Sequence, residues 1–568
     1  MTSLTAAHPD DGPLTPSQPA SSADVSSAED RAQDASTLAR SGALNLVGMG
    51  LYGALNFVLV IIVTRQLGAA GGGAFLEAVA LYSILSKSAV LGADLGLLRY
   101  VSRLRGLRRT HEIASTFRVA LVPVAVIGTV FGVAVFLAAS PLSRLLSHGV
   151  GRSDLTTYLR VMAPFVPVGA VYLALESATR GFGTMVPSVA IERIGRPALQ
   201  PVLMLAALAA GLGSAAIALS WIAPTVVALV PMAVWTVVLV RRVEASNAEA
   251  GAQHTTEHTP HLAREFWRFS SPRALGGVFQ VAIIWLDALL IGALASTREA
   301  GIYTATTRWL IVGSFAGLAI TQAVGHQISF VLARRERARA KHLFAVSTGW
   351  LILVSFPAYL TVMVFAPLLL QAFGHGFGEG VDALVILGAA NLFAGACGAV
   401  DVVLQMAGKS SLSLADNAVA LAANIVLNLV LVPRYGIVGA AAAWAVSLVI
   451  TNAAPLVQVW RAEGLHPFSA GWVYAVALPL GAVGAVEVGF RALFGATLPA
   501  LAGALVLAGT LYAAGLLWFR DRLDLDQFAN ALTAGVRRAS GEPNGGSSPH
   551  RHGVRRRLPP VRMNRRAR

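Results

Sequence analysis

Ionisable side chains stand inside long apolar runs of this sequence, and their types and spacing are the first clue to its chemistry. A charge within a membrane-crossing helix is costly, so such a residue faces protein or a water-filled cavity and marks a functional site or a buried ion pair. The cations are Lys87, Arg193, Arg196, Arg273 and Arg308, and the anions are Glu77, Asp94, Glu176, Glu192, Asp287, Asp401, Asp416 and Glu487.

Two of the cations, Lys87 and Arg308, lie deep in their apolar runs. Lysine presents a point charge and arginine a planar fork, and both bind phosphate. We therefore expect these two side chains to bind an anionic, phosphate-bearing substrate. Arg196 and Arg273 lie nearer the cytoplasm, where we expect them to meet the substrate first. The alternative is that both simply extend to the headgroups.

The stretch from Phe269 to Trp309 places Asp287 in the middle of an apolar run. Counting back by sevens gives Gln280 and Arg273, which share a helix face with Asp287 because seven residues are nearly two turns. Such a polar stripe predicts the wall of a polar cavity, with Asp287 paired with a cation across it. The alternative is a buried ion pair that only holds two helices together.

Other polar residues are spaced to share helix faces. Lys87 and Asp94 are seven residues apart, and Glu192 precedes Arg196 by four, the order that favours an ion pair on a helix. Pro197 removes a backbone donor, so we expect its helix to be bent.

Three asparagines, Asn417, Asn424 and Asn428, fall on one face of a later helix. Amides hydrogen-bond sugar hydroxyls, and we expect Asn424 and Asn428 to bind substrate. Amides also hold neighbouring membrane helices together, which is the alternative for all three.

The composition identifies the class of protein. The chain has 568 residues, of which 55% are hydrophobic and 13% charged, and its mean hydropathy is +0.64. Soluble domains carry about 25% charged residues, so we expect an all-α polytopic membrane protein. No nucleotide-binding motif, catalytic constellation or metal-ligand spacing is found. We therefore expect neither an enzyme nor a bound cofactor or metal.

Apolar segments of about 20 residues predict about fourteen transmembrane helices. The expected organisation is a disordered cytoplasmic extension (1–42), an N-lobe of six helices (43–242), a cytoplasmic loop (243–268), a C-lobe of six helices (269–461), two further helices (462–520) and a basic cytoplasmic tail (521–568). The least regular helix, 186–210, is interrupted by Glu192, Arg193 and Arg196.

Arginine clusters predict the orientation. They follow the second, sixth and eighth predicted helices, near residues 99–109, 241–268 and 334–341. The positive-inside rule then places both termini in the cytoplasm of a multi-pass plasma-membrane protein. The arginine-rich tail from Arg537 onward is expected to contact anionic lipid rather than nucleic acid.

The chain also repeats itself. An offset of about 225 residues pairs Glu176 with Asp401 and Gly211 with Gly436, and an offset of about 228 aligns GAFLEAV (73–79) with GIYTATT (301–307). A repeat of six spans gives two lobes related by a pseudo-two-fold axis along the membrane normal. We expect substrate to bind between the lobes near mid-membrane. The acids expected to couple or gate its movement are Asp287, Asp94, Glu176 and Asp401.

Five motifs resemble the multidrug/oligosaccharidyl-lipid/polysaccharide exporter superfamily, and especially its polysaccharide-lipid flippases. They are VTRQLGAAGGGAF (63–75), LGADLGLLRYVSR (91–103), WLDALLIG (285–292), EAGIYTATTRW (299–309) and NIVLNLVLVPRYGIVGAA (424–441). The resemblance implies a two-lobe fold of fourteen helices that opens to one side of the membrane at a time. By position, Arg308 matches the basic residue after the family's G-x-Y motif and Asp287 the acid of its W-x-D segment.

The resemblance also implies a function. A protein of this kind moves polyprenyl-pyrophosphate-linked oligosaccharide from the cytoplasmic to the outer leaflet for cell-surface polysaccharide synthesis. The expected partners are this lipid-linked oligosaccharide, membrane lipid and glycosyltransferases or a polymerase of the same pathway, and the protein is expected to be a monomer.

Other functions remain open from the sequence. Within the superfamily they are a lipid II flippase of peptidoglycan synthesis or a cation-coupled multidrug exporter. The basic residues fit the exporter poorly. Outside the superfamily, one alternative is a membrane glycosyltransferase or polymerase, which would need a large outer loop or an acidic catalytic pair. Another is a receptor or scaffold, which only the two terminal tails support.

Overall fold

A computed structural model describes residues 22–107, 109–147, 151–249, 262–523 and 525. The chain divides into two compact units, residues 1–40 with 530–568, and residues 41–529. In the first unit only the helical residues 22–40 are described, so the basic tail lies almost wholly outside the description. Every side chain discussed below belongs to the second unit.

The described residues are helical and contain no strand. The first half comprises α1 (Ser22–Ala89), α2 (Ala93–Gly106), α3 (His111–Leu146), α4 (Arg152–Met162), η1 (Ala163–Phe165), α5 (Val166–Gly181), η2 (Ser188–Gly195), α6 (Arg196–Ala209) and α7 (Ser214–Glu249). α1 begins inside the extension 1–42 that the sequence predicted to be disordered. The predicted loop 243–268 is shortened by α7 at one end and by α8 at the other.

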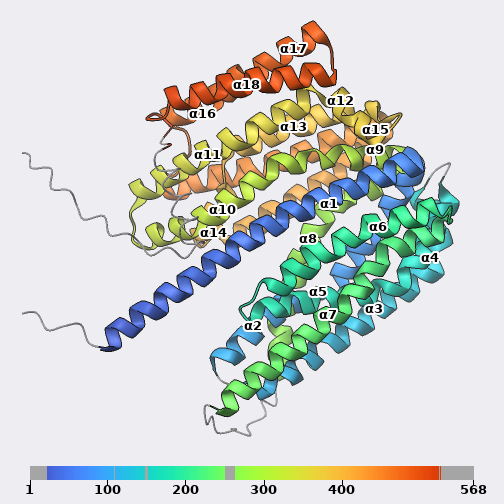
Figure 1. Cartoon of the computed structure of the whole chain (residues 1–568), viewed down its shortest axis with the longest axis vertical. Coiled ribbons are helices and arrows are strands. Elements are labelled where there is room, and N and C mark those ends of the chain that lie inside the picture. Colours follow the sequence, from blue (N-terminus) through green and yellow to red (C-terminus); the bar gives the residue numbers. More distant parts are fainter. Residues whose placement is uncertain (1–21, 108, 148–150, 250–261, 524, 526–568) are drawn as a thin grey trace, which may run out of the picture. The chain divides into compact units, whose positions relative to one another are not determined.

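The second half is built in the same way. It comprises α8 (Leu262–Leu294), α9 (Thr297–Arg308), α10 (Leu310–Ala333), α11 (Arg337–Val364), α12 (Ala366–Leu370), η3 (Gln371–Phe373), η4 (Phe377–Gly380), α13 (Val381–Cys397), α14 (Val400–Met406) and α15 (Ser410–Glu463). Three further helical segments follow, α16 (Ala470–Pro479), η5 (Leu480–Ala485) and α17 (Val486–Phe494), and then α18 (Leu498–Trp518). α16, η5 and α17 pack along α11 (Figure 1).

The hydropathy of these helices confirms the all-α membrane class. Within the described residues, nine helices are long and apolar enough to cross a membrane, or ten if the bent α8 is one span. Two of the nine, residues 47–89 and 410–463, would be roughly 65 and 80 Å long if straight, against a membrane core of ~30 Å. The count of fourteen remains a prediction.

Two glycines divide these over-long helices. Gly68 in α1 (φ 68°, ψ −177°) and Gly436 in α15 (φ 54°, ψ −135°) depart from helical geometry. A positive φ is readily available only to glycine, so the residue type fixes where each long helix is kinked. Each part is then of a length that suits a single crossing of the bilayer.

The internal repeat is visible in the backbone. Gly183 and Gly408, 225 residues apart, follow helix ends with φ of 80° and 79°, and Gly211 and Gly436 have φ of 64° and 54°. The shared offset therefore pairs glycines of positive φ in the two halves, although Gly211 lies in the turn before α7 and Gly436 at the kink inside α15.

The two halves meet where equivalent residues approach each other. A Cβ added to Gly73 would lie 1.8 Å from the carbonyl oxygen of Thr297, and one added to Gly301 would lie 2.3 Å from that of Ala69. Gly73 and Gly301 are the first residues of the two aligned motifs. A residue that contacts its own equivalent is the signature of a two-fold axis, so the pseudo-axis of the repeat passes near this crossing.

Candidate functional site

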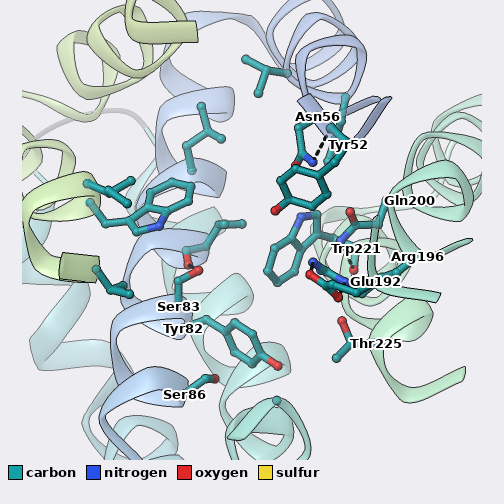
Figure 2. Close-up of a pocket in the computed structure, with 18 of the residues that line it drawn as sticks. Tyr52, Asn56, Tyr82, Ser83, Ser86, Glu192, Arg196, Gln200, Trp221 and Thr225 are labelled. Atoms are coloured by element: carbon teal, nitrogen blue, oxygen red, sulfur yellow. Dashed lines mark hydrogen bonds and ion pairs between the residues drawn. The ribbon is translucent and has the colours of Figure 1, made fainter. Parts of the chain in front are cut away.

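A cavity of about 630 Å³ lies between the two halves and is lined by α1, α5, η2, α6, α7, α8, α9 and α10. Figure 2 shows its polar and aromatic lining, with Tyr52, Tyr82 and Trp221 around the same space as Glu192 and Arg196. A large concave site with an apolar and aromatic wall and a few converging polar groups is the usual form of a small-molecule binding site.

Among the residues that the structure describes, four cations line this cavity, against the single lining acid Glu192. The sequence predicted three of them as substrate ligands, and they come from separate elements. The four are Lys87 of α1, Arg193 of η2, Arg196 of α6 and Arg308 of α9. Arg193 was only noted as an ionisable residue, although it is three residues before Arg196 and therefore on nearly the same helix face.

Two of the cations are held by carboxylates. Lys87 Nζ lies 2.5 Å from Asp94 Oδ2. The sequence predicted that they share a face of one helix, but α1 ends at Ala89 and Asp94 belongs to α2, so the pair forms across the break between two helices. Arg196 donates to both carboxylate oxygens of Glu192, from Nη2 at 2.6 Å and from Nε at 2.8 Å. These bonds hold each cation at the cavity wall and leave further donors of both groups to bind a ligand.

Arg308 is placed differently. Its guanidinium carbon lies 5.3 Å from the ring centre of Trp285, a cation–π contact. Its Nε is buried without a hydrogen-bond partner, and within the described part of the chain it joins no ion pair. Arg308 therefore offers the cavity a guanidinium that no carboxylate neutralises.

The helix that carries Arg193 and Arg196 is irregular. Residues Ser188–Gly195 form a π-helical turn, and α6 begins at Arg196 with Pro197 in its first turn. The sequence predicted a bend here. π-Helical turns are rare and occur frequently at functional sites. This one carries two charged residues of the cavity lining, Glu192 and Arg193, and the third, Arg196, follows directly after it.

Asp287 does not line the cavity, and the predicted cation partner is replaced by neutral donors. The residue is 3% exposed. Its carboxylate accepts hydrogen bonds from the Tyr303 hydroxyl and from Nδ2 of Asn428, each at 3.0 Å. Asn428 also donates to the carbonyl of the buried Asn424. Asn424 and Asn428 thus lie outside the cavity lining, and Asn428 holds α15 against α8.

Arg273 also lies outside the cavity lining. It is exposed, donates to the carbonyl oxygen of Phe269 at 2.7 Å and has its guanidinium carbon 3.8 Å from the Phe269 ring centre. The segments 262–279 and 281–294 of α8 are bent by 43° relative to each other. A count by sevens across this bend does not keep Arg273 on the face of Asp287.

The other two acids predicted to couple or gate, Glu176 and Asp401, occupy equivalent environments. Ser188 donates to Glu176 and Ser413 donates to Asp401, and in each case the serine is twelve residues after the acid. Four residues after each acid, Arg180 and Gln405 donate to it at 3.0 and 2.7 Å. Both acids are therefore fixed inside their own halves, away from the cavity lining.

Residues 38–325, just over half of the chain, match the family described as polysaccharide biosynthesis protein. The chain belongs to this family. The resemblance predicted from the motifs is thereby confirmed. The site described above falls largely within the matched residues, since every residue of the cavity lining lies between Met49 and Ile311.

Two curated relatives of this polysaccharide biosynthesis protein are similar over part of their length. The probable low-salt glycan biosynthesis flippase Agl15 of Haloferax volcanii is 23% identical over 186 residues, 33% of this chain and 39% of that protein. The uncharacterized membrane protein YabM of Bacillus subtilis is 28% identical over 216 residues, 36% and 40% of the two chains. The chain thus spans about two fifths of the length of each relative.

Solved structures show the fold of this family member. The lipid II flippase MurJ in an inward closed conformation gives a TM-score of 0.62 at 11% identity, covering 84% of this chain and 98% of MurJ. An inward-facing MATE family transporter of the MOP superfamily gives 0.57 at 15% identity, covering 75% and 98%. The fold is that of a multi-pass MOP-type transporter, and the relatives with named activities are flippases and transporters rather than enzymes.

Proposed function

We propose that this protein flips a polyprenyl-pyrophosphate-linked oligosaccharide from the cytoplasmic to the outer leaflet of the plasma membrane, for cell-surface polysaccharide synthesis. The observation that carries the proposal is the cavity between the halves, where four cations face one carboxylate. The family and the relative named as a glycan flippase support the same substrate class.

The pyrophosphate is the part of such a substrate that is hardest to move. A bare charge in the membrane interior costs several kcal/mol or more. Lys87 and Arg308, one from each half, both line the cavity and would supply positive charge to it. Arg308 is the stronger candidate, because within the described residues it has no ion pair to exchange, whereas Lys87 must share its charge with Asp94.

The sugars need a different surface, and the same cavity provides it. Tyr52, Tyr82 and Trp221 present rings, and Asn56 and Gln200 present amides (Figure 2). Aromatic rings with polar edges pack on the flat faces of sugars, while amides bond their hydroxyls. The lipid tail can remain in the bilayer, so the cavity has to enclose only the headgroup.

The buried acids are proposed to report occupancy to the rest of the fold. Asp94 is poised to release Lys87 to a phosphate, since both anions compete for one ammonium group. Asp287 joins α8 to α9 and α15 through Tyr303 and Asn428, next to Trp285 and Arg308. A rearrangement of these hydrogen bonds would change the contacts of α8, α9 and α15 together.

Transport across a vesicle membrane tests the proposal. Lys87→Gln and Arg308→Gln remove charge with little change of size. Each should lower the initial flipping rate of a pyrophosphate-linked oligosaccharide at least ~100-fold, because each removes charge-assisted hydrogen bonds that nothing replaces. Arg308→Lys should retain part of the rate, since it keeps the charge and loses the fork. Wild-type rates for both glutamine variants would overturn the proposal.

The same vesicles separate this function from its alternatives. Lipid II offered in parallel distinguishes a peptidoglycan-precursor flippase, which would prefer it. A cationic dye tests for a drug exporter. The four cations of the cavity should repel this dye, so we expect no transport of it. Arg273→Gln is the matched control, since it removes an exposed guanidinium outside the cavity lining. A loss of flipping in this variant would instead support the entry role predicted from the sequence.

A further inference from the structure

A second pocket, of about 430 Å³, lies at the ends of α2, α5 and α7, outside the cavity described above. Its lining includes Ser102, Arg105, Arg180, Gly181, Gly183 and Val243. The ends of α2 and α7 begin two of the arginine-rich stretches that the positive-inside rule predicts to be cytoplasmic. The proposed transport of a lipid-linked sugar makes no use of this pocket.

The two arginines of the pocket meet at one helix end. Arg105 donates from Nη1 to the carbonyl oxygen of Gly181 at 3.3 Å, next to Arg180 in the chain. Arg180 donates from Nη2 to Glu176 and Ser177, while its Nε is buried without a partner. A guanidinium has five N–H donors, so most donors of this pair have no hydrogen-bond acceptor among the described residues.

The charge around the pocket is unbalanced. Arg241 and Arg242 are exposed at the end of α7, directly before the lining residue Val243. Of the acids nearby, Arg180 already holds Glu176, and Glu244 follows Val243 in the chain. Like charges held together repel, and a bound anion relieves that repulsion. Basic pockets between membrane helices on the cytoplasmic side are suited to phosphate headgroups.

The internal repeat shows that Arg180 is not needed to build this turn. In the second half the equivalent of Arg180 is Gln405, which donates to Asp401 at 2.7 Å in the same way that Arg180 donates to Glu176 at 3.0 Å. Gly183 and Gly408 close both turns with the same φ. A neutral amide therefore satisfies the acid, and the positive charge at Arg180 has to be explained by something other than folding.

We propose that Arg105 and Arg180 form a phosphate-binding site at the ends of α2, α5 and α7, separate from the transport cavity. The ligand is a phosphate group, carried either by an anionic phospholipid headgroup or by a soluble molecule. Arginine forks match phosphate oxygens in pairs, and two forks with free donors can grip one group from two sides.

Thermal unfolding of the purified full-length protein in neutral detergent tests this site. The probes are short-chain phosphatidylglycerol, short-chain phosphatidylcholine and inorganic pyrophosphate. A ligand that binds only the folded state raises the melting temperature. The melting temperature of the wild type should rise more with phosphatidylglycerol than with phosphatidylcholine, or it should rise with pyrophosphate. A response to phosphatidylglycerol identifies a lipid headgroup as the ligand, and a response to pyrophosphate identifies a soluble phosphate. Arg105→Gln with Arg180→Gln should weaken the binding of that probe about tenfold or more.

Two controls locate the effect. Arg334→Gln removes an exposed guanidinium at the end of α10 and should keep the full rise. Lys87→Gln with Arg308→Gln removes two cations from the transport cavity, where pyrophosphate is also proposed to bind, so the rise that remains in this variant reports the second pocket. If the double pocket variant does not fold, Arg105→Gln alone, which loses one bond to a backbone carbonyl, takes its place. The proposal is overturned if no probe raises the wild-type melting temperature, if the pocket variant responds like wild type, or if only the cavity variant loses the response.

Discussion

The two halves of the molecule share a backbone plan and differ in where they keep their charges. Positions 192, 193 and 196 of the first half are Glu, Arg and Arg, and all three line the cavity. At the offset of 225, the equivalent residues of α15 are Asn417, Ala418 and Leu421. The first half therefore presents charge to the substrate space where the second half has a regular helix with neutral residues.

At a second set of equivalent positions, the second half is polar and the first half is apolar. The buried network of the second half consists of Asp287, Tyr303 and Asn428. At the offsets of 228, 228 and 225, the first half has Leu59, Phe75 and Leu203, of which Leu59 and Phe75 are buried in an apolar core. The same scaffold accepts either arrangement, so neither set of polar residues is a requirement of the fold. Each marks a task that only one half performs.

The largest expected effect on flipping comes from replacing the charged cavity residues of the first half with the neutral residues at the equivalent positions of the second half. Glu192→Asn, Arg193→Ala and Arg196→Leu together copy the equivalent positions of α15. Flipping in vesicles should fall at least ~100-fold, because two guanidinium groups are lost from the cavity. The melting temperature should stay near that of wild type, since no unpaired charge is left buried. Asn417→Ala, in the second half, is the matched control, and unchanged flipping in the triple variant would refute the division of tasks.

A smaller effect is expected from the buried network. Asp287→Asn keeps the shape of the side chain and removes the charge that Tyr303 and Asn428 both address. Flipping should fall about tenfold, while the amount of folded protein stays near normal. The amide oxygen can accept from Nδ2 of Asn428, and the new amide NH2 can donate to the Tyr303 hydroxyl, which also accepts. Loss of the folded protein, judged by size-exclusion chromatography, would show that the network only holds helices together. Tyr303→Phe, which resembles the Phe75 of the other half, should lie between Asp287→Asn and wild type.

Substitutions at Gly73 and Gly301, where the two halves meet, should destabilise the protein to a similar extent. A Cβ at Gly301 would overlap the carbonyl oxygen of Ala69, and one at Gly73 that of Thr297. Gly301→Ala and Gly73→Ala should each destabilise the protein by about 1–3 kcal/mol through overpacking. Gly276→Ala, at a helical site with nothing within 4 Å of its Cβ, should be neutral or slightly stabilising. Thermal melting of the three variants measures this, and opposite signs for Gly73 and Gly301 would argue against a pseudo-axis here.

The smallest effect is expected at the turn that both halves share. Arg180→Gln copies Gln405, and the new amide can donate to Glu176 as Gln405 donates to Asp401. The free energy of unfolding in the absence of phosphate should change by less than about 1 kcal/mol, because the hydrogen bond is kept and a partly exposed ion pair contributes little. Chemical denaturation would show it. A loss of several kcal/mol would mean that the two turns are not equivalent.

Much of this fold could be predicted from the sequence, because a membrane imposes simple rules. Apolar length locates helices, and glycine marks the places where φ must be positive. The offset that pairs Gly183 with Gly408 and Gly211 with Gly436 relates glycines that all have a positive φ in the structure. The number of crossings could not be settled in the same way, since α1 and α15 run through their kinks as continuous helices.

The site was predictable only in part. Lys87, Arg196 and Arg308 line the cavity, because a cation deep in an apolar run has few other places to go. The partners of Asp287 were not predictable, since Asn428 lies 141 residues away and no local pattern says that α8 and α15 are neighbours. Arg273 was placed on the face of Asp287 by a seven-residue count that assumes a straight helix, and α8 is bent.

The contact between Gly73 and Gly301 has a consequence for how easily the two halves can separate. A closure formed by interlocking side chains must reset many rotamers whenever it parts, and each costs conformational entropy to order again. Two glycines have no rotamers, and the groups nearest to them are largely backbone. Separating the two glycines would therefore cost little side-chain entropy, although their neighbours Phe75 and Ile302 are buried in one apolar cluster that holds the halves together. In the proposed transport cycle, a ligand that binds one arrangement of the halves better than the other would shift their populations by that difference in affinity.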